Sequence, residues 1–265
     1  MKDAILHDLQ RIRAEAPLVH NITNYVVMNT TANALLCLGA SPVMAHAAEE
    51  VEEMAAMAAA LVINIGTLSS SWIESMLKAG RKAKERGIPI VLDPVGAGAT
   101  RFRTETAQTL LREARPTIVR GNASEILALG QTAQGTKGVD ATHRTEQALD
   151  TARALARQHG CVVVVSGAVD LAVSPERTIR GLNGHPMMAK VTGLGCTASA
   201  LAGAFAAVNS DPLRAAAHAM AVMGIAGEIA AERAQGPGSL QMRFLDVLYG
   251  LAESDVVSRL RIEEA

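Results

Sequence analysis

Aromatic residues are scarce in this sequence of 265 residues, and it has no excess of positive charge. The chain has one Trp, two Tyr and three Phe, and its formal net charge at pH 7 is -1. Proteins that bind nucleic acids usually present a basic surface, often with aromatic rings on which bases stack. The composition therefore predicts that this protein has no nucleic-acid partner.

Cysteine is equally scarce, and the sequence has no long apolar run. Cys37, Cys161 and Cys196 are odd in number, far apart and without CxxC spacing, which argues against a disulfide framework and a structural zinc site. The first residues, M-K-D-A-I-L-H-D-L-Q, are charged and amphipathic, unlike a secretory signal. No stretch approaches the roughly 18 apolar residues that a membrane helix needs. We therefore expect a soluble cytoplasmic protein with no membrane contact.

Hydrophobic residues make up 49% of the chain, and short apolar segments alternate with segments of helical periodicity. The expected strands are residues 18–22, 41–45, 61–65, 88–92, 117–119 and 161–165, with a hairpin at 172–181. The expected helices are residues 3–15, 25–38, 49–60, 70–86, 104–114, 145–158, 196–207, 212–234 and 239–254, with a polar loop at 130–140. This alternation predicts a mostly parallel sheet covered by helices on both faces, in one α/β domain spanning residues 1–265.

Polar turns follow several of the expected strands. They are residues 93–100, 120–125, 166–170 and 192–197. In an open α/β sheet, ligands bind beyond the carboxyl ends of the strands, and parallel strands present those ends at one edge. We therefore expect Asp93, Arg120 and Glu125 to lie close together at a ligand-binding edge.

The segment 189–207, A-K-V-T-G-L-G-C-T-A-S-A-L-A-G-A-F-A-A, begins as a turn with two glycines and becomes an Ala-rich helix. Gly193 and Gly195 allow backbone conformations and close approaches that a β-carbon would obstruct. A helix start has unsatisfied N–H groups and a partial positive charge, which suit an anion such as phosphate. The same field is expected to favour the thiolate of Cys196.

Together these turns contain the groups that phosphoryl transfer requires, because its catalysis consists largely of positioning and charge neutralisation. Asp93 and Glu125 are the candidate Mg²⁺ ligands, partly through water, and Arg120 is the candidate for nucleotide phosphate. Each residue also has a structural interpretation. Asp93 could simply end a strand, and Arg120 could be a surface cation. Glu125 could be the first-turn acid of a helix capped by Asn122.

Three other residues have both a structural and a functional interpretation. Asn24 in H-N-I-T-N either caps a helix or lies at the mouth of a pocket, and Met44 is either a core residue or a ligand contact. Cys196 as a nucleophile would need a base, and the sequence shows no recognisable relation between it and His185 or His218. The Walker pattern is absent, and so is G-x-G-x-x-G after the first strand.

Six motifs occur in order between residues 18 and 207. They are V-H-N-I-T-N, L-G-A-S-P-V-M-A, N-I-G-T-L, V-L-D-P-V-G-A-G-A-T, R-G-N-A-S-E-I and V-T-G-L-G-C-T. In this order they closely resemble the motifs of hydroxyethylthiazole kinases, which belong to the ribokinase-like superfamily. The resemblance implies a three-layer α/β/α sandwich. It also implies ATP- and Mg²⁺-dependent phosphorylation of 4-methyl-5-(2-hydroxyethyl)thiazole at its hydroxyl, in thiamine biosynthesis and salvage.

The resemblance also implies roles for single residues. Met44 resembles the substrate contact of the P-V-M-A strand, and Gly193 resembles a backbone contact beside the hydroxyethyl group. Arg120 and Ser166 resemble nucleotide contacts, although many relatives carry Thr rather than Ser at the latter position. Both residue types offer a hydroxyl, so the role is expected to be kept.

Other residues match the family more loosely. Asn24 and Thr67 are candidates for the thiazole pocket, and Asp93 and Glu125 match the metal and phosphate region of the superfamily. The family typically forms homotrimers with the thiazole site between neighbouring subunits, so a homotrimer is expected here. An apolar ring needs a largely apolar pocket, which Met44 suits.

The sequence departs from sugar-kinase relatives at the opening of the Ala-rich helix. Those relatives typically read G-A-G-D, with the Asp as general base, whereas this chain reads G-L-G-C at 193–196. We expect Gly193, Gly195 and Cys196 to form the catalytic group. A thiol has an unperturbed pKa near 8.5, and the helix start is expected to lower it. Cys196 is then expected to assist as a modest base without being indispensable.

Three rival functions fit parts of this pattern. One is another ribokinase-like kinase, such as one acting on hydroxymethylpyrimidine. The second is a thiol-dependent hydrolase or transferase that uses Cys196 as its nucleophile and needs neither ATP nor Mg²⁺. The third is a non-catalytic nucleotide sensor.

Overall fold

A mixed sheet forms the middle layer of the computed structural model, which describes residues 1–130 and 141–264. Its nine strands in the described residues are β1 Leu18–Ile22, β2 Ser41–Val43, β3 Ala60–Asn64, β4 Ile90–Asp93, β5 Ile118–Asn122, β6 Val162–Ser166, β7 Asp170–Val173, β8 Thr178–Gly181 and β9 Ile262–Glu264. Their order across the sheet is β2-β1-β3-β4-β5-β6-β7-β8-β9. The pairs from β2 to β6 are parallel, and the remaining pairs are antiparallel.

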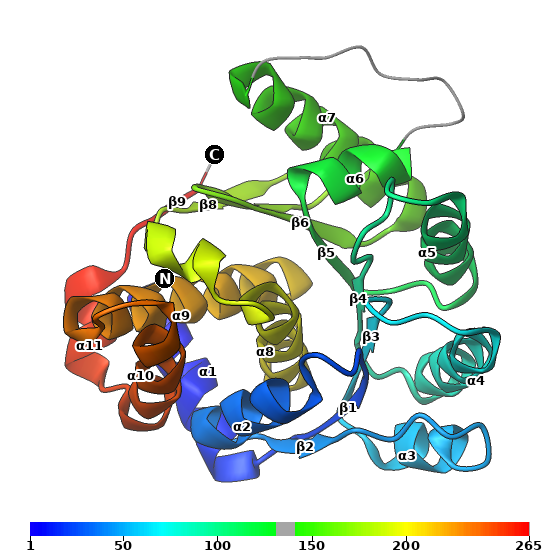
Figure 1. Cartoon of the computed structure of the whole chain (residues 1–265), viewed down its shortest axis with the longest axis horizontal. Coiled ribbons are helices and arrows are strands. Elements are labelled where there is room, and N and C mark those ends of the chain that lie inside the picture. Colours follow the sequence, from blue (N-terminus) through cyan, green and yellow to red (C-terminus); the bar gives the residue numbers. More distant parts are fainter. Residues whose placement is uncertain (131–140, 265) are drawn as a thin grey trace.

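Helices cover both faces of this sheet (Figure 1). On one face lie α3 Val51–Met57, α4 Ser70–Arg86, α5 Arg101–Glu113, α6 Ala123–Gly130 and α7 Ala141–His159. On the other lie α1 Lys2–Glu15, α2 Met28–Leu38, α8 Leu194–Val208, α9 Pro212–Arg233, α10 Pro237–Gly250 and α11 Glu253–Arg259, with the 3₁₀ helix η1 Pro186–Lys190. The two faces bury separate hydrophobic clusters. The arrangement confirms the three-layer α/β/α fold with a mostly parallel sheet.

The apolar composition of the central strands follows from this double cover. All residues of β3 and β4 are buried, including the polar Asn64 and Asp93 at their carboxyl ends. A strand between two helix layers has no solvent face and cannot alternate apolar with polar residues. The two buried polar side chains therefore need partners inside the protein.

Helix α8 is buried on nearly every side, which its Ala-rich sequence makes possible. It packs against β1, β3 and β4 and against α2 and α9. A β-carbon on Gly203 would lie 2.7 Å from Val62 Cγ2, so the helix axis comes close to the sheet only because this residue is glycine. Close packing places the start of α8 over the carboxyl ends of the strands.

Several element boundaries differ from the prediction. β5 continues through Arg120 to Asn122 and leads directly into α6, where the sequence had indicated a turn at 120–125. The expected helix 239–254 is divided into α10 and α11. The fourth polar turn, 192–197, follows η1 rather than a strand. Of the expected loop 130–140, all residues after Gly130 lie outside the described residues.

Among the described helices, none is long and apolar enough to cross a membrane. The three cysteines are unpaired.

Candidate active site

Strand register brings the predicted polar residues to one edge of the sheet. Asn64 of β3 pairs with Asp93 of β4, and Asn122 of β5 pairs with Ser166 of β6. All four strands are parallel, so their carboxyl ends meet there. Arg120 belongs to this edge as well, because its Nη2 donates a hydrogen bond to Ser166 Oγ at 2.6 Å.

Asp93 has one engaged and one unengaged carboxylate oxygen. Oδ2 accepts hydrogen bonds from Asn64 Nδ2 at 2.9 Å and from Ser199 Oγ at 2.7 Å, and Arg120 Nη1 lies 3.9 Å away. Oδ1 is buried and has no hydrogen-bond partner within the described part of the chain. Burial raises the pKa of Asp93 to about 6, an effect that the charge of Arg120 opposes. The free oxygen is the one available to a ligand.

Arg120 lies against the start of α8, and glycine makes this contact possible. A β-carbon on Gly195 would lie 2.8 Å from Arg120 Nη1. The guanidinium is therefore held between Ser166 on one side and the first turn of α8 on the other. The first N–H groups of a helix have no partner within the helix, so this turn and Arg120 together offer hydrogen-bond donors of the kind that suit a phosphate.

Gly193 is the residue immediately before α8 and has a left-handed backbone conformation, with φ 87°. A β-carbon there would lie 2.6 Å from Val27 Cγ1, next to the start of α2. Both the conformation and the close approach require glycine. The predicted catalytic turn Gly193–Cys196 is thus fixed between α2 and Arg120.

Cys196 does not behave as the sequence predicted. Its Sγ accepts a hydrogen bond from Asn24 Nδ2 at 3.5 Å. Burial, and after it the charge of Asp93, raise the pKa of the thiol to about 11. The expectation that the helix start favours the thiolate is therefore wrong, because desolvation and a neighbouring carboxylate outweigh the helix dipole.

The two histidines nearest to Cys196 in sequence lie elsewhere. His218 Nδ1 is 2.6 Å from Asp8 Oδ2 in the core, and His185 caps η1 through a hydrogen bond from Met187 N. Neither is placed to activate the thiol. A nucleophilic cysteine also needs a lowered pKa, so the geometry argues against the thiol-dependent hydrolase or transferase.

Glu125 forms the structural contact that the sequence had left as an alternative. Its Oε2 accepts from Asn122 N at 2.8 Å, and Glu125 N donates to Asn122 Oδ1 at 3.0 Å, which caps α6 reciprocally. Its Oε1 accepts from Gly96 N at 2.8 Å, so the carboxylate also ties down the Gly-rich turn after β4. That turn follows Asp93 directly in sequence, and after burial, which is the main cause, the charge of Glu125 also raises the pKa of Asp93.

The described residues include no cluster of three or more His, Cys, Asp or Glu side chains that could enclose a metal ion. Mg²⁺ usually keeps several waters and takes only one or two carboxylates from the protein. The buried, unpartnered Asp93 Oδ1 fits such an ion, with Glu125 nearby. The two predicted metal residues are thus compatible with a water-rich Mg²⁺ site.

The predicted thiazole-pocket residues follow three neighbouring strands. Asn24 follows β1, and its Nδ2 also donates to Asn64 Oδ1 at 2.9 Å, which joins it to Asp93 through one amide. Thr67 lies half-buried in the turn after β3. Met44 lies half-buried directly after the edge strand β2. Asn24 is therefore linked to Asp93, whereas Met44 lies at the edge of the sheet, two strands away from β3.

Sequence reasoning missed three residues that hold this site together. Asn64 and Ser199 both donate to Asp93 Oδ2. Arg103 of α5 donates to the carbonyl oxygens of Ile65, Gly66 and Val95 and so joins the turns after β3 and β4. A polar residue ending the apolar run A-L-V-I-N was a signal for Asn64. The sequence offered no comparable signal for the other two.

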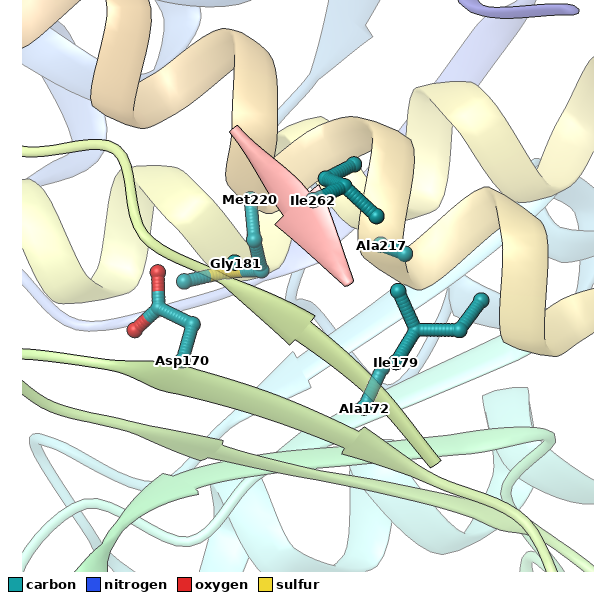
Figure 2. Close-up of a pocket in the computed structure, with 7 residues that line it drawn as sticks. All are labelled: Asp170, Ala172, Ile179, Gly181, Ala217, Met220 and Ile262. Atoms are coloured by element: carbon teal, nitrogen blue, oxygen red, sulfur yellow. The ribbon is translucent and has the colours of Figure 1, made fainter. Parts of the chain in front are cut away.

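A small pocket beside the turn 166–170 was also missed (Figure 2). It is lined by Asp170, Ala172, Ile179, Gly181, Ala217, Met220 and Ile262. Figure 2 shows Ile179 and Ile262 reaching toward each other and toward Ala217 of α9. Asp170 is its only carboxylate, and it accepts a hydrogen bond from Gly167 N at 3.0 Å. Burial raises the pKa of Asp170 to about 6. β9 supplies Ile262, and because this strand was not predicted, the pocket could not be.

Comparisons with known proteins find matches that cover nearly the whole chain. The model of the "Hydroxyethylthiazole kinase family" matches residues 9–254. A hydroxyethylthiazole kinase of Syntrophus aciditrophicus is 62% identical over 96% of this chain and 94% of its own length. A solved structure of the hydroxyethylthiazole kinase protein from Pyrococcus horikoshii superposes with a TM-score of 0.91 at 47% identity, covering 99% of both chains.

A more distant structure shows how widely the fold is shared. A ribokinase-like superfamily protein from Enterococcus faecalis has a TM-score of 0.62 at 15% identity, covering 91% of this chain and 89% of its own. At such identity the likeness concerns the fold alone.

Proposed function

Because the chain belongs to the hydroxyethylthiazole kinase family, we propose that it transfers the terminal phosphoryl group of ATP to the hydroxyl of 4-methyl-5-(2-hydroxyethyl)thiazole. The reaction serves thiamine biosynthesis and salvage. The observation that carries the proposal is the contact of Arg120 with Ser166 and with the glycine-containing start of α8, at the edge where Asp93 presents a free oxygen.

Arg120 and Ser166 are the proposed contacts for nucleotide phosphate. The guanidinium is partly buried and fixed by the Ser166 hydroxyl, so little side-chain freedom is lost when it binds an anion. The N–H groups at the start of α8, from Gly193 to Cys196, receive the transferring phosphoryl group. Charge developing on that group is thus stabilised without rearrangement of the protein.

Mg²⁺, when bound, neutralises charge on the phosphate oxygens, and Asp93 Oδ1 with Glu125 would hold it, in part through water. Asn64 and Ser199 keep the other Asp93 oxygen occupied. Arg120 lies between this carboxylate and Ser166, the other proposed nucleotide contact. The hydrogen bonds from Asn64 and Ser199 orient the Asp93 carboxylate, so Oδ1 is its oxygen left for the ion.

The alcohol is proposed to lie between Gly193, Asn24 and Thr67, with Met44 against the thiazole ring. Because the Cys196 thiol has its pKa raised to about 11, it is protonated at neutral pH and can donate a hydrogen bond to the substrate hydroxyl or orient it. A loose transition state leaves the hydroxyl acidic only late in the reaction, so no strong base is required. Cys196 is accordingly an assisting residue.

Three further features of the proposal concern the protein's setting. A homotrimer with the thiazole site between subunits fits the half-buried position of Met44 at the sheet edge. The unpaired cysteines support a reducing cytoplasm. Residues 1–265 are proposed to act as one kinase domain.

Incubation of the purified protein with ATP and the thiazole alcohol, with and without Mg²⁺, tests the proposal. Mass spectrometry is expected to show the thiazole phosphate, and its yield should fall when Mg²⁺ is chelated. Parallel reactions with hydroxymethylpyrimidine and a sugar measure selectivity. Failure to detect the phosphate at high enzyme concentration, or better turnover of the pyrimidine, would overturn the proposed substrate.

A further inference from the structure

Three rings pack together, and we refer to Tyr25, His46 and Trp72 as the aromatic cluster. The Trp72 ring centroid lies 5.0 Å from that of Tyr25 and 4.5 Å from that of His46, both tilted. Trp72 is 6% exposed, whereas Tyr25 is 65% exposed. In a chain with so few aromatics, the only tryptophan has a ring neighbour on each of two other segments.

The three rings come from the segments that follow three adjacent strands. Tyr25 follows β1, His46 follows β2, and Trp72 lies in the first turn of α4, after β3. These strands are neighbours in the order β2-β1-β3. Ser69 Oγ accepts a hydrogen bond from Trp72 N at 3.3 Å and so fixes the first turn of α4. Trp72 therefore provides a fixed surface that two loop segments share.

Each segment also carries one of the proposed thiazole contacts. Asn24 directly precedes Tyr25, and Met44 lies two residues before His46. Thr67 lies in the turn that leads to Trp72. The aromatic cluster thus connects the three segments, and each ring lies only a few residues from one of the proposed contacts.

Of the three segments, the one that carries Met44 depends most on the aromatic cluster for its position. Backbone pairing of β2 with β1 ends at Val43, opposite His20. Beyond Met44, Ala45 O lies 2.8 Å from His20 Nε2, and the His46 ring packs on Trp72. Side chains therefore continue the attachment that the sheet no longer supplies.

We propose that the aromatic cluster positions the alcohol-binding residues, with Trp72 fixing the Met44 and Asn24 segments relative to each other. This inference rests on the proposed function, because it takes those residues as the thiazole contacts. Its members act through their neighbours and are positioning residues. The cluster should govern affinity for the alcohol and leave the nucleotide side, built on Arg120 and Ser166, unchanged.

Steady-state kinetics of Tyr25→Ala and His46→Ala test this separation. Aromatic pairs contribute about 0.5–1.5 kcal/mol, so each variant should raise the KM for the thiazole alcohol roughly 2- to 13-fold. The KM for ATP and kcat should stay within about twofold. Tyr25→Phe keeps the ring and should restore the wild-type KM. Tyr249→Ala, which removes the other exposed tyrosine from α10, is the matched control.

Circular dichroism melting shows whether each variant is folded, and the exposed position of Tyr25 makes its variant the safer one. Folded variants with an unchanged KM for the alcohol would overturn the inference. Equal increases in both KM values would overturn it as well. A wild-type enzyme that does not phosphorylate the alcohol would instead contradict the proposed function.

Fluorescence gives a second measurement, because all tryptophan emission comes from Trp72. Titration of the wild-type protein with the thiazole alcohol should change the emission in a saturable way, whereas ADP alone should leave it unchanged. In Tyr25→Ala the half-saturating alcohol concentration should rise by the same factor as KM. Binding of the alcohol measured by calorimetry without any change in emission would contradict a coupling between cluster and pocket.

Discussion

At the scale of single residues, Asp93 illustrates how the fold tolerates a costly group at its centre. The carboxyl is almost completely buried, and three donors or charges face one of its two oxygens. Desolvation still dominates, since it raises the pKa to about 6. The ionised form that a metal requires is therefore less stable in the folded protein than in water.

Asp93→Asn should make the protein more stable and less active. The pKa of Asp93 in the folded protein lies above 3.8, the ordinary value that applies in the unfolded chain. The native protein therefore binds more protons than the unfolded chain between about pH 4 and 6. The stabilisation that the protonated Asp93 gives to the folded state is thus fully present below about pH 4 and is lost as the pH rises through about 6. At pH 8 the neutral amide should raise the free energy of unfolding by on the order of 2–3 kcal/mol, and at pH 4 by little.

Urea denaturation of both proteins at pH 4 and pH 8 measures this difference, and a phosphorylation assay measures the expected loss of turnover, on the order of 100-fold. A variant that is less stable than wild type at pH 8 would show that the hydrogen bonds to Asp93 outweigh its desolvation.

Cys196→Ala should keep most of the turnover. The thiol is protonated at neutral pH because its pKa is raised to about 11, so the enzyme loses a hydrogen-bonding group and no base. We expect kcat to fall less than about tenfold and Cys196→Asp to remain active. Cys37→Ala on α2 serves as the control. Complete loss of turnover in the Ala, Ser and Asp variants, with ATP binding intact, would give Cys196 an essential role.

At the scale of elements, α8 connects packing to catalysis. Its first turn meets Arg120 at Gly195, and its third turn meets the sheet at Gly203. Both contacts depend on missing β-carbons, and between them Ser199 reaches Asp93. A shift of the helix away from the sheet would therefore disturb the phosphate site and the carboxylate together.

Gly203→Leu should destabilise the protein through this contact. Val62 Cγ2 lies 2.7 Å from the position of the new β-carbon, and Val19 lies 3.3 Å away, so the strands or the helix must move. Overpacking of this kind costs about 1–3 kcal/mol or more, which thermal melting can measure. Gly238→Ala in α10 has open space around it and should be neutral or slightly stabilising. Equal melting temperatures for both variants would contradict close packing of α8.

The elements themselves were largely predictable. α4 has the predicted bounds, and β1 does too, because apolar runs and amphipathic periods were unambiguous there. The separate α6 was predicted only as the alternative interpretation of Glu125, and the last strand β9 was not predicted. β9 has three residues, and only its pairing with β8 makes it a strand. Such short segments owe their structure to contacts distant in sequence.

The candidate site was predictable to a similar extent. Parallel strands explain why Asp93, Arg120 and Ser166 meet, and the structure shows them together. Their roles in binding stay predictions. The protonation of Cys196 could not be read from sequence, since the helix start was visible but the depth of burial and the distance to Asp93 were not. The partners of Asp93 were hidden for the same reason.

At the scale of the whole molecule, a buried polar contact joins the first helix to the last third of the chain. Asp8 of α1 lies 2.6 Å from His218 Nδ1 of α9 and accepts a hydrogen bond from Asn209 Nδ2 at 2.7 Å. Both Asp8 and His218 are almost completely buried. The pair fixes α1 against helices that are synthesised about 200 residues later.

Asp8→Ala should weaken the whole fold without affecting substrate binding. It leaves His218 and Asn209 without their shared acceptor in the core, which costs about 2–4 kcal/mol in free energy of unfolding. Denaturant melting measures the loss, and the KM values for ATP and the alcohol should not change. Asp3→Ala, at an exposed position of the same helix, should be close to neutral. A large change in either KM would contradict the separation of this contact from the site.

The division of the core between the two sheet faces has a consequence for synthesis on the ribosome. The cluster under α3 to α7 uses residues between Ile22 and Val173, so it can close while later residues are still being added. The buried side chains of α1 wait for α8 and α11, which pack against that helix. Although α1 precedes that cluster in sequence, it is therefore covered later, and nascent chains halted near residue 180 should expose it to chaperones and proteases.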